Sequence, residues 1–371
     1  MKDYLLLTPG PTNVPQRVLD KTALPMIHHR TKEFQAVLER VNGNLRKFFV
    51  TQHPVMTFAA SGTGAMEATV TNLLSKGDTV ISISAGKWGE RYRDIAKVYG
   101  MDVKSYELPY GTAVKAEAVK EALAKNPTAK AVLVTLCETS TAVTHPVQEI
   151  AQITRESGAL LFVDAISGLG CDPLKMDEWG VDVVVCGSQK GMMLPPGLAF
   201  VAVNDRAVAA IAKSNLPKYY FNFAETLKAI QKHDTPFTPA VSLIRGMDEA
   251  LTMLLEEGIE NVWKRHAQVA AFVRQKVTGL GLALFSKAPS NGLTAIEMPP
   301  GIASKDVIKV MRDERKVVMA DGQGELQGKI VRFAHMGSAC TLADAQYGFE
   351  AFCHAMQKAG FKSPALQGVS S

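Results

Sequence analysis

Three groups of residues that could bind or transform a small molecule follow three separate apolar segments. They are the glycine-rich segment 61–65 (SGTGA), the acid Asp164 and the lysine Lys190. At the start of a helix, the free N–H groups of segment 61–65 would bind an anion. At the end of a strand, Asp164 could cap the next segment, bind Mg²⁺ or pair with a ring nitrogen. The small and apolar residues around Lys190 could lower the pKa of its amine and make it a nucleophile.

Taken singly, each group also has an ordinary structural explanation: a packing turn, a helix cap and a solvated lysine. Together, in this order and each at the exit of its own strand, they match a single ligand. That ligand carries a phosphate, a protonatable ring nitrogen and an aldehyde, which are the groups of pyridoxal phosphate (PLP). In this interpretation Asp164 keeps the ring nitrogen protonated. Lys190 holds the aldehyde as a Schiff base and later moves the α-proton of the substrate.

An alternation of predicted strands and helices would position these groups. Apolar strands separated by helices favour an α/β fold, with a mostly parallel sheet covered on both faces. The turns that follow parallel strands share one edge of the sheet, where open α/β sheets bind ligands. The pattern predicts strands over residues 55–58, 79–84, 102–107, 131–136, 159–164, 181–186 and 198–203. It predicts helices over residues 31–49, 88–99, 116–124 and 146–157, and a further helix that follows the glycine-rich turn 60–65 and ends near residue 74.

The chain has a different character on either side of this alternation. Four prolines among the first 25 residues predict an extended arm. After Pro239 two long helices are predicted, followed by a smaller α+β pattern. Since 371 residues exceed what one core usually supports, we expect more than one domain. The expected division is an N-terminal arm (1–22), a large cofactor-binding domain (23–255) and a small C-terminal domain (256–371).

Composition and charge limit the classes of function. The chain is 47% hydrophobic and 21% charged, as in a globular protein, and its net charge of +5 is small. Its basic residues are interleaved with acids, which argues against a nucleic-acid partner. The apolar run 5–7 is too short for a signal peptide or a membrane span, so we expect a cytoplasmic location and no membrane partner. The five cysteines suggest neither a disulfide framework nor a metal site, and no histidine spacing supports zinc.

Seven segments, in order along nearly the whole chain, resemble motifs of the class V aminotransferases, which are PLP enzymes of fold type I. The resemblance is greatest to the alanine–glyoxylate and serine–glyoxylate (serine–pyruvate) group. It implies a mostly parallel central sheet in a large domain and a smaller α+β C-terminal domain. The segments are LLTPGPT (6–12), SGTGAME (61–67), GKWGER (86–91), ETSTAV (138–143), VDAISGLG (163–170), GSQKGMMLPPG (187–197) and VRFAHMG (331–337).

The resemblance also implies roles for individual residues. Asp164 would pair with the ring nitrogen, Lys190 would carry the aldehyde, and Arg332 would bind the substrate carboxylate as a bidentate fork. The remaining cofactor contacts would come from Thr63, Gly64, Ala65 and Gln189 at the phosphate, Trp88 and Ile166 on the ring, and Thr139 near the phenolic oxygen.

A homodimer with active sites at the subunit interface is also implied. In such a dimer Thr238, or alternatively Thr235, would reach the phosphate of the neighbouring subunit. His28 and His29 would border the substrate entrance, or would be ordinary loop residues.

The predicted reaction is a ping-pong transamination. An amino group would pass from alanine, serine or aspartate to glyoxylate or pyruvate. Two alternatives remain open: a PLP-dependent cysteine desulfurase or lyase, with Cys340 as the sulfur acceptor, and a non-catalytic subunit of a larger complex. A dinucleotide-dependent oxidoreductase is disfavoured, because the glycine fingerprint is incomplete. Ala65 stands where some relatives carry histidine, and Thr139 where many carry serine.

Overall fold

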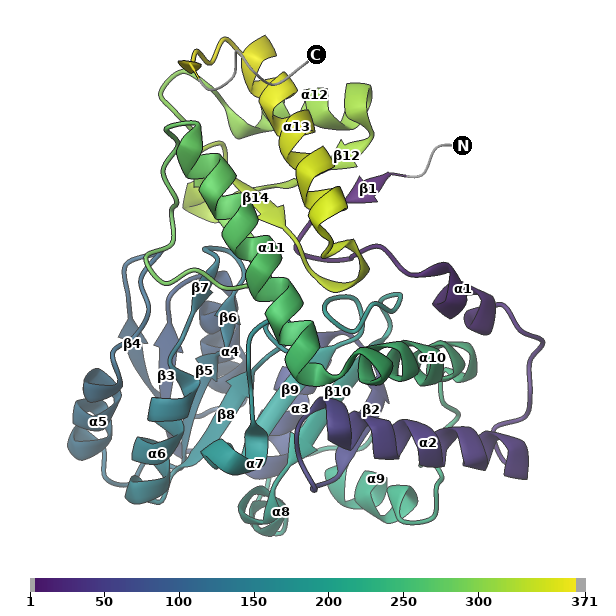
Figure 1. Ribbon diagram of the computed structural model, residues 1–371. Helices are drawn as coiled ribbons and strands as arrows, with labels where there is room; N and C mark the ends of the chain where they lie inside the picture. Colours follow the sequence, from purple (N-terminus) through teal and green to yellow (C-terminus); the bar gives the residue numbers. More distant parts are fainter. Residues whose placement is uncertain (1–3, 365–371) are drawn as a thin grey trace.

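A seven-stranded sheet forms the centre of the fold in the computed structural model, which describes residues 4–364 (Figure 1). The strand order is β2-β10-β9-β8-β5-β3-β4. β10 is antiparallel to both of its neighbours, and the other adjacent pairs are parallel. β2 therefore runs in the same direction as β8 and β9, and all three end at one edge. The strands are β2 (Val55–Ala59), β3 (Thr79–Ser84), β4 (Asp102–Glu107), β5 (Ala131–Thr135), β8 (Leu160–Asp164), β9 (Val183–Gly187) and β10 (Leu198–Val203).

Helices cover both faces of this sheet, which explains why its inner strands β5, β9 and β10 are buried and largely apolar along their whole length. In β5, for example, Val132 and Val134 face one buried cluster, whereas Ala131 and Leu133 face another. The predicted α/β fold with a mostly parallel sheet is confirmed. The first cluster is covered by α2 (Lys32–Phe48), α5 (Ala116–Lys125), α6 (Val147–Ser157) and α10 (Val241–Glu257), and the second by α3 (Gly62–Leu73), α4 (Lys87–Val98), α8 (Asp205–Ile211) and α9 (Phe223–Ile230).

The prediction of a fully extended N-terminal arm is wrong for residues 16–22, which form helix α1 (Gln16–Thr22). So short a helix depends on tertiary contacts. Val18 is completely buried, and α1 packs against α10. Gly246 permits this close approach, because a Cβ atom there would lie 2.6 Å from Cγ2 of Thr22. Closer to the N-terminus the arm is extended, as predicted. There β1 (Leu5–Leu6) pairs with β12 (Val317–Val318).

The C-terminal part forms a separate hydrophobic cluster, in addition to the two on the large sheet, around a three-stranded antiparallel sheet. Leu7 of the N-terminal arm is buried in this cluster with Phe333 and Phe352. The sequence pattern did not predict helix α12, because its sequence is strongly charged. Its buried apolar residues are Val307 and Met311. The division of the chain near residue 255 stays a prediction. The elements are α11 (Ile259–Gly279), β11 (Leu293–Glu297), α12 (Ser304–Arg315), β13 (Ala320–Asp321), β14 (Ile330–Ala334) and α13 (Leu342–Lys358).

Several short elements that were not predicted complete the structure. The short elements are the hairpin β6 (Cys137–Glu138) and β7 (Val143–Thr144), the helix α7 (Met176–Trp179), and the 3₁₀ turns η1 (Gly324–Leu326) and η2 (Gly337–Ala339).

Among residues 4–364, no helix contains an apolar stretch long enough to cross a bilayer.

Candidate active site

The carboxyl ends of β2, β8 and β9 bring the three predicted groups together. Ile166 links two of them: its N–H donates to Oδ1 of Asp164 at 2.9 Å, and its side chain packs against the start of α3. A Cβ atom on Gly62 would lie only 2.4 Å from Cδ1 of Ile166, so the close packing at this point requires glycine. Lys190 follows β9, and its Nζ lies 5.9 Å from the centre of the Trp88 ring.

Lys190 is a buried lysine, and burial lowers the pKa of its amine to about 8. Its ammonium group donates to the carbonyl oxygen of Pro9, and Oγ1 of Thr12 donates to the Lys190 carbonyl at 3.2 Å. A Cβ atom at Gly10 would lie 2.5 Å from the Lys190 side chain. The N-terminal segment therefore encloses the lysine and keeps it from water. An amine with a lowered pKa is a better nucleophile at neutral pH.

Asp164 is a buried acid whose pKa is raised to about 7, mainly because burial disfavours its charge. The hydrogen bond from Ile166 opposes this rise. No ion pair to Asp164 forms among residues 4–364. A protonated ring nitrogen placed beside this carboxylate would supply the missing counter-charge and lower the pKa of Asp164 again.

The start of α3 offers donors for a phosphate. The N–H groups of Gly62 and Thr63 lie at the helix N-terminus and, within the described chain, have no backbone acceptor. Oγ1 of Thr63 accepts from the guanidinium of Arg91 at 3.1 Å. The Gln189 side chain lies next to Ile166 at Gly187, and its buried Oε1 has no hydrogen-bond partner among the described residues. The free N–H groups of Gly62 and Thr63 fit the phosphate of PLP, Lys190 fits its aldehyde and Asp164 fits its ring nitrogen.

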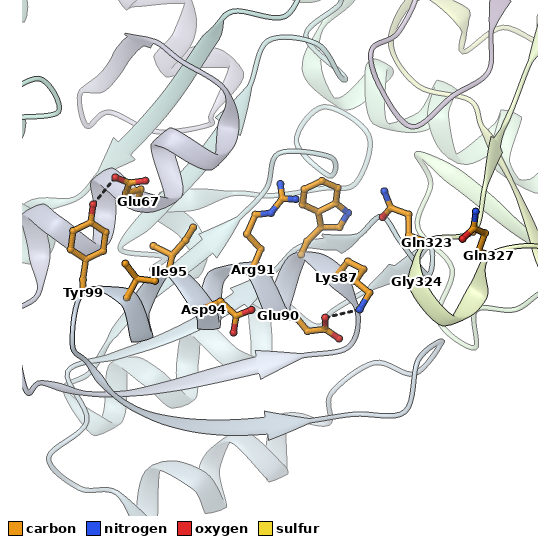
Figure 2. Close-up of a pocket in the computed structure, with 13 residues that line it drawn as sticks. Glu67, Lys87, Glu90, Arg91, Asp94, Ile95, Tyr99, Gln323, Gly324 and Gln327 are labelled. Atoms are coloured by element: carbon orange, nitrogen blue, oxygen red, sulfur yellow. Dashed lines mark hydrogen bonds and ion pairs between the residues drawn. The ribbon is translucent and has the colours of Figure 1, made fainter.

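Trp88 is held in the first turn of α4. The guanidinium of Arg91 lies over its ring, 4.2 Å from the centroid, as in a cation–π pair. Beside this pair is a cavity of about 920 Å³ between α4 and the loop 322–327. Figure 2 shows Lys87, Glu90 and Arg91 on α4, with Gln323 and Gln327 on the other side.

Arg332 lies in β14 and is buried, which lowers the pKa of its guanidinium to about 10. Its Nε donates to the carbonyl of Asp321 at 2.9 Å, and one terminal nitrogen donates to the carbonyl of Thr139 at 3.3 Å. The Thr139 hydroxyl in turn donates to Oγ of Ser167 at 2.5 Å. Thr139 therefore contacts both Arg332 and the loop that follows β8.

Thr238 lies away from this cluster. It is exposed, lines a cavity of about 500 Å³ with His28 and His29, and forms no hydrogen bond with the residues around Lys190. The hydroxyl of Thr235 is already engaged, since it donates to the carbonyl of Phe237 at 2.8 Å. Of the two threonines, Thr238 thus has the hydroxyl available for an external ligand.

Glu138 is a residue of the site to which the sequence interpretation gave no role. It is completely buried and accepts hydrogen bonds from the backbone N–H groups of Trp88 and Gly89. The signal that could have revealed it resembles that of Asp164, because it is an acid directly after an apolar strand. Arg91, the last residue of the segment GKWGER (86–91), was also given no role.

Cys340 does not have the environment of a sulfur acceptor. It is completely buried, and burial raises the pKa of its thiol to about 12. Sulfur-transfer cysteines need an accessible thiolate. Across residues 4–364, no group of three or more histidine, cysteine or acidic residues is placed to hold a metal ion.

A buried lysine, a buried acid and an anion cradle at the carboxyl edge of such a sheet define a PLP-dependent enzyme of fold type I. The class V aminotransferase family model matches residues 4–343, and the chain belongs to this family. It is therefore a PLP-dependent transaminase.

Curated relatives and a solved structure agree with this assignment. The chain is 36% identical to a serine–glyoxylate aminotransferase of Methylorubrum extorquens, over 90% of this chain and 86% of that one. It is 35% identical to an L-aspartate–glyoxylate aminotransferase of Paracoccus denitrificans, over 90% of this chain and 86% of that one. The crystal structure of pyridoxamine–pyruvate aminotransferase from Mesorhizobium loti matches with a TM-score of 0.94 and 30% identity, covering 99% of this chain and 95% of that chain.

Proposed function

We propose that this enzyme transfers the amino group of a small L-amino acid, alanine or serine first and aspartate second, to glyoxylate or pyruvate. The transfer would follow a ping-pong mechanism at Lys190. The relatives named above, a serine–glyoxylate and an L-aspartate–glyoxylate aminotransferase, support these substrate classes.

The observation that carries the proposal is the buried Arg332, on which the carboxylates of Asp321 and Glu138 act without forming a direct ion pair. Among residues 4–364 it forms no ion pair, and its recorded hydrogen bonds go to two neutral carbonyls. A buried cation without a counter-ion is costly, and a substrate carboxylate would remove that cost. The planar guanidinium can also bind a carboxylate through two parallel hydrogen bonds. Arg332 thus supports an α-carboxylate substrate.

The other residues have matching roles. When bound, PLP supplies an electron sink for the bond that breaks at the substrate α-carbon. Lys190, whose pKa burial lowers to about 8, would accept the substrate α-proton on Nζ and later donate it again. Asp164 holds its negative charge at the ring nitrogen. The Pro9–Gly10 segment covers Lys190 closely and would thereby select a small substrate side chain.

We further propose a homodimer in which Thr238 completes the phosphate site of the partner. Tyr219 is 83% exposed, and its ring lies 5.8 Å from that of Phe237, beside Thr238. Exposed aromatic clusters of this kind are typical of protein interfaces. The cavity that Thr238 shares with His28 and His29 lies in the same region.

Absorption spectroscopy of the PLP-loaded enzyme tests the substrate proposal. We expect the visible cofactor band to bleach with L-alanine or L-serine and to return when glyoxylate or pyruvate is added. Arg332→Lys should raise the KM of the donor by at least about tenfold, with a smaller change in kcat. Bleaching by L-aspartate alone would reassign the donor. Release of sulfide from L-cysteine without recovery of the band by oxo acids would favour the desulfurase alternative.

A further inference from the structure

Glu138, in β6, is buried beside the site with its side chain fully engaged. Oε2 accepts from the N–H groups of Trp88 and Gly89, both at 3.0 Å. Oε1 accepts from the N–H of Ser140 at 3.1 Å and from its hydroxyl at 2.6 Å. Burial raises the pKa of Glu138, and these hydrogen bonds oppose the rise. Such a set of donors suits a carboxylate.

These hydrogen bonds replace a missing cap on α4. The residue before the helix is Gly86, which has no side chain to accept from the first N–H groups. The Lys87 N–H donates to Oγ of Ser140 at 3.0 Å, while the next two donate to Glu138. The first turn is therefore capped by a hairpin about fifty residues further along the chain, with a negative group at the positive end of the helix.

Two glycines make this contact possible. A Cβ atom on Gly86 would lie 2.4 Å from Oγ of Ser140 and 2.6 Å from Cδ of Glu138. A Cβ atom on Gly89 would lie 2.7 Å from the carbonyl oxygen of Ile83 in β3. The first turn of α4 is thus held between the sheet on one side and Glu138 on the other.

The Trp88 ring depends on this backbone support. Its indole Nε1 is buried and has no hydrogen-bond partner among residues 4–364, so no hydrogen bond of its own fixes the ring, whose face contacts the cations of Arg91 and Lys190. We propose that Glu138 is a positioning residue, which caps α4 and thereby sets the Trp88 indole where it stacks on the cofactor. This inference rests on the proposed role of Trp88 at the PLP ring.

The test follows Trp88 in the protein without cofactor. With Trp179→Phe and Trp263→Phe in the background, Trp88 is the remaining tryptophan of the chain. Glu138→Ala leaves two buried N–H groups without an acceptor. In the Glu138→Ala variant we expect the near-ultraviolet circular dichroism of Trp88 to fall by at least about half. We expect acrylamide quenching of the Trp88 fluorescence to rise about twofold. PLP should then bind about tenfold more weakly.

Glu138→Gln is the conservative control. Its amide oxygen can accept from Trp88 and Gly89, and its NH₂ group can donate to Oγ of Ser140. We expect Glu138→Gln to retain most of the Trp88 signal. Ser140→Ala, which removes a partner of Glu138 and of the Lys87 N–H, should lose part of that signal.

A folded Glu138→Ala protein with unchanged Trp88 dichroism and quenching would overturn the inference. If that variant does not fold, an unchanged signal in Ser140→Ala overturns it instead. Failure of the parent enzyme to bind PLP would refute the proposed function. The Trp88 signals of the cofactor-free protein would still decide whether Glu138 positions the indole.

Discussion

At the scale of single residues, the chemistry depends on charges that are buried before the ligand arrives. Lys190, Asp164 and Arg332 each have a pKa shifted toward the neutral form by burial. Asp164 would regain its charge beside the ring nitrogen and Arg332 beside the substrate carboxylate. Lys190 would act as the neutral amine. The site is thus arranged at a cost to the stability of the empty protein, as functional sites often are.

The cost of burying Lys190 gives a prediction about stability. With its pKa lowered from 10.5 to about 8, the protonated lysine destabilises the folded state by roughly 3 kcal/mol. This penalty is complete below about pH 8 and disappears as the pH rises toward 10.5. In urea unfolding without cofactor, Lys190→Met should be more stable than the parent at pH 7 and lose that advantage by pH 10. An advantage that does not change with pH, or one also given by the exposed control Lys97→Met, would contradict this.

Asp164→Asn separates the charge of the acid from its hydrogen bond. Asparagine can still accept from the Ile166 N–H but cannot pair with a protonated ring nitrogen. We expect the variant to fold and to bind PLP, with kcat lower by at least about 10²-fold. Steady-state kinetics with alanine and glyoxylate measures this effect. A kcat within about threefold of the parent would show that Asp164 does not act through its charge.

At the scale of elements, glycines decide how closely the chain can pack around the site. Gly246 in α10 contacts α1, where a Cβ atom would lie 2.6 Å from Thr22. Gly43, in α2, has no atom within 4 Å of such a Cβ. Gly246→Ala should therefore lose about 1–3 kcal/mol through overpacking, whereas Gly43→Ala should gain about 0.5–1 kcal/mol. Urea denaturation of both variants checks the opposite signs, and equal effects would refute the packing argument.

The elements also show where prediction from sequence ends. Uniformly apolar strands such as 131–135 could be predicted, because burial on both faces leaves a clear pattern. The antiparallel direction of β10 could not, since an apolar strand has the same pattern in either direction. α1 was missed because tertiary contacts, rather than periodicity, stabilise it, and α12 was missed because its few apolar residues stand in a strongly charged sequence.

The site was predictable to the extent that its residues follow strands. Lys190 and Asp164 share a sheet edge because their strands are parallel neighbours. Glu138 was not assigned a role, since its partners Trp88 and Gly89 lie about fifty residues away in sequence. Its place directly after an apolar strand was a signal, but its contact with the first turn of α4 leaves no local pattern in the sequence.

At the scale of the whole molecule, the exposed Thr238 is explained if a second copy of the chain uses it. Sedimentation should give twice the chain mass. Tyr219→Asp, which places a charge in the exposed aromatic cluster, should shift this toward the monomer. Thr238→Ala should remain dimeric and bind PLP about tenfold more weakly. Leu342→Asp, at an exposed position on α13, is the control. A monomeric parent enzyme with full activity would refute the dimer proposal.

The most direct test of the central claim is to locate the cofactor on the chain. Borohydride reduction of the PLP-loaded enzyme fixes the bond between aldehyde and lysine, and peptide mass spectrometry then finds the modified residue. We predict a phosphopyridoxyl group on Lys190 alone, which is absent when the enzyme is first treated with an amino donor. Modification of another lysine, or none at all, would contradict the account.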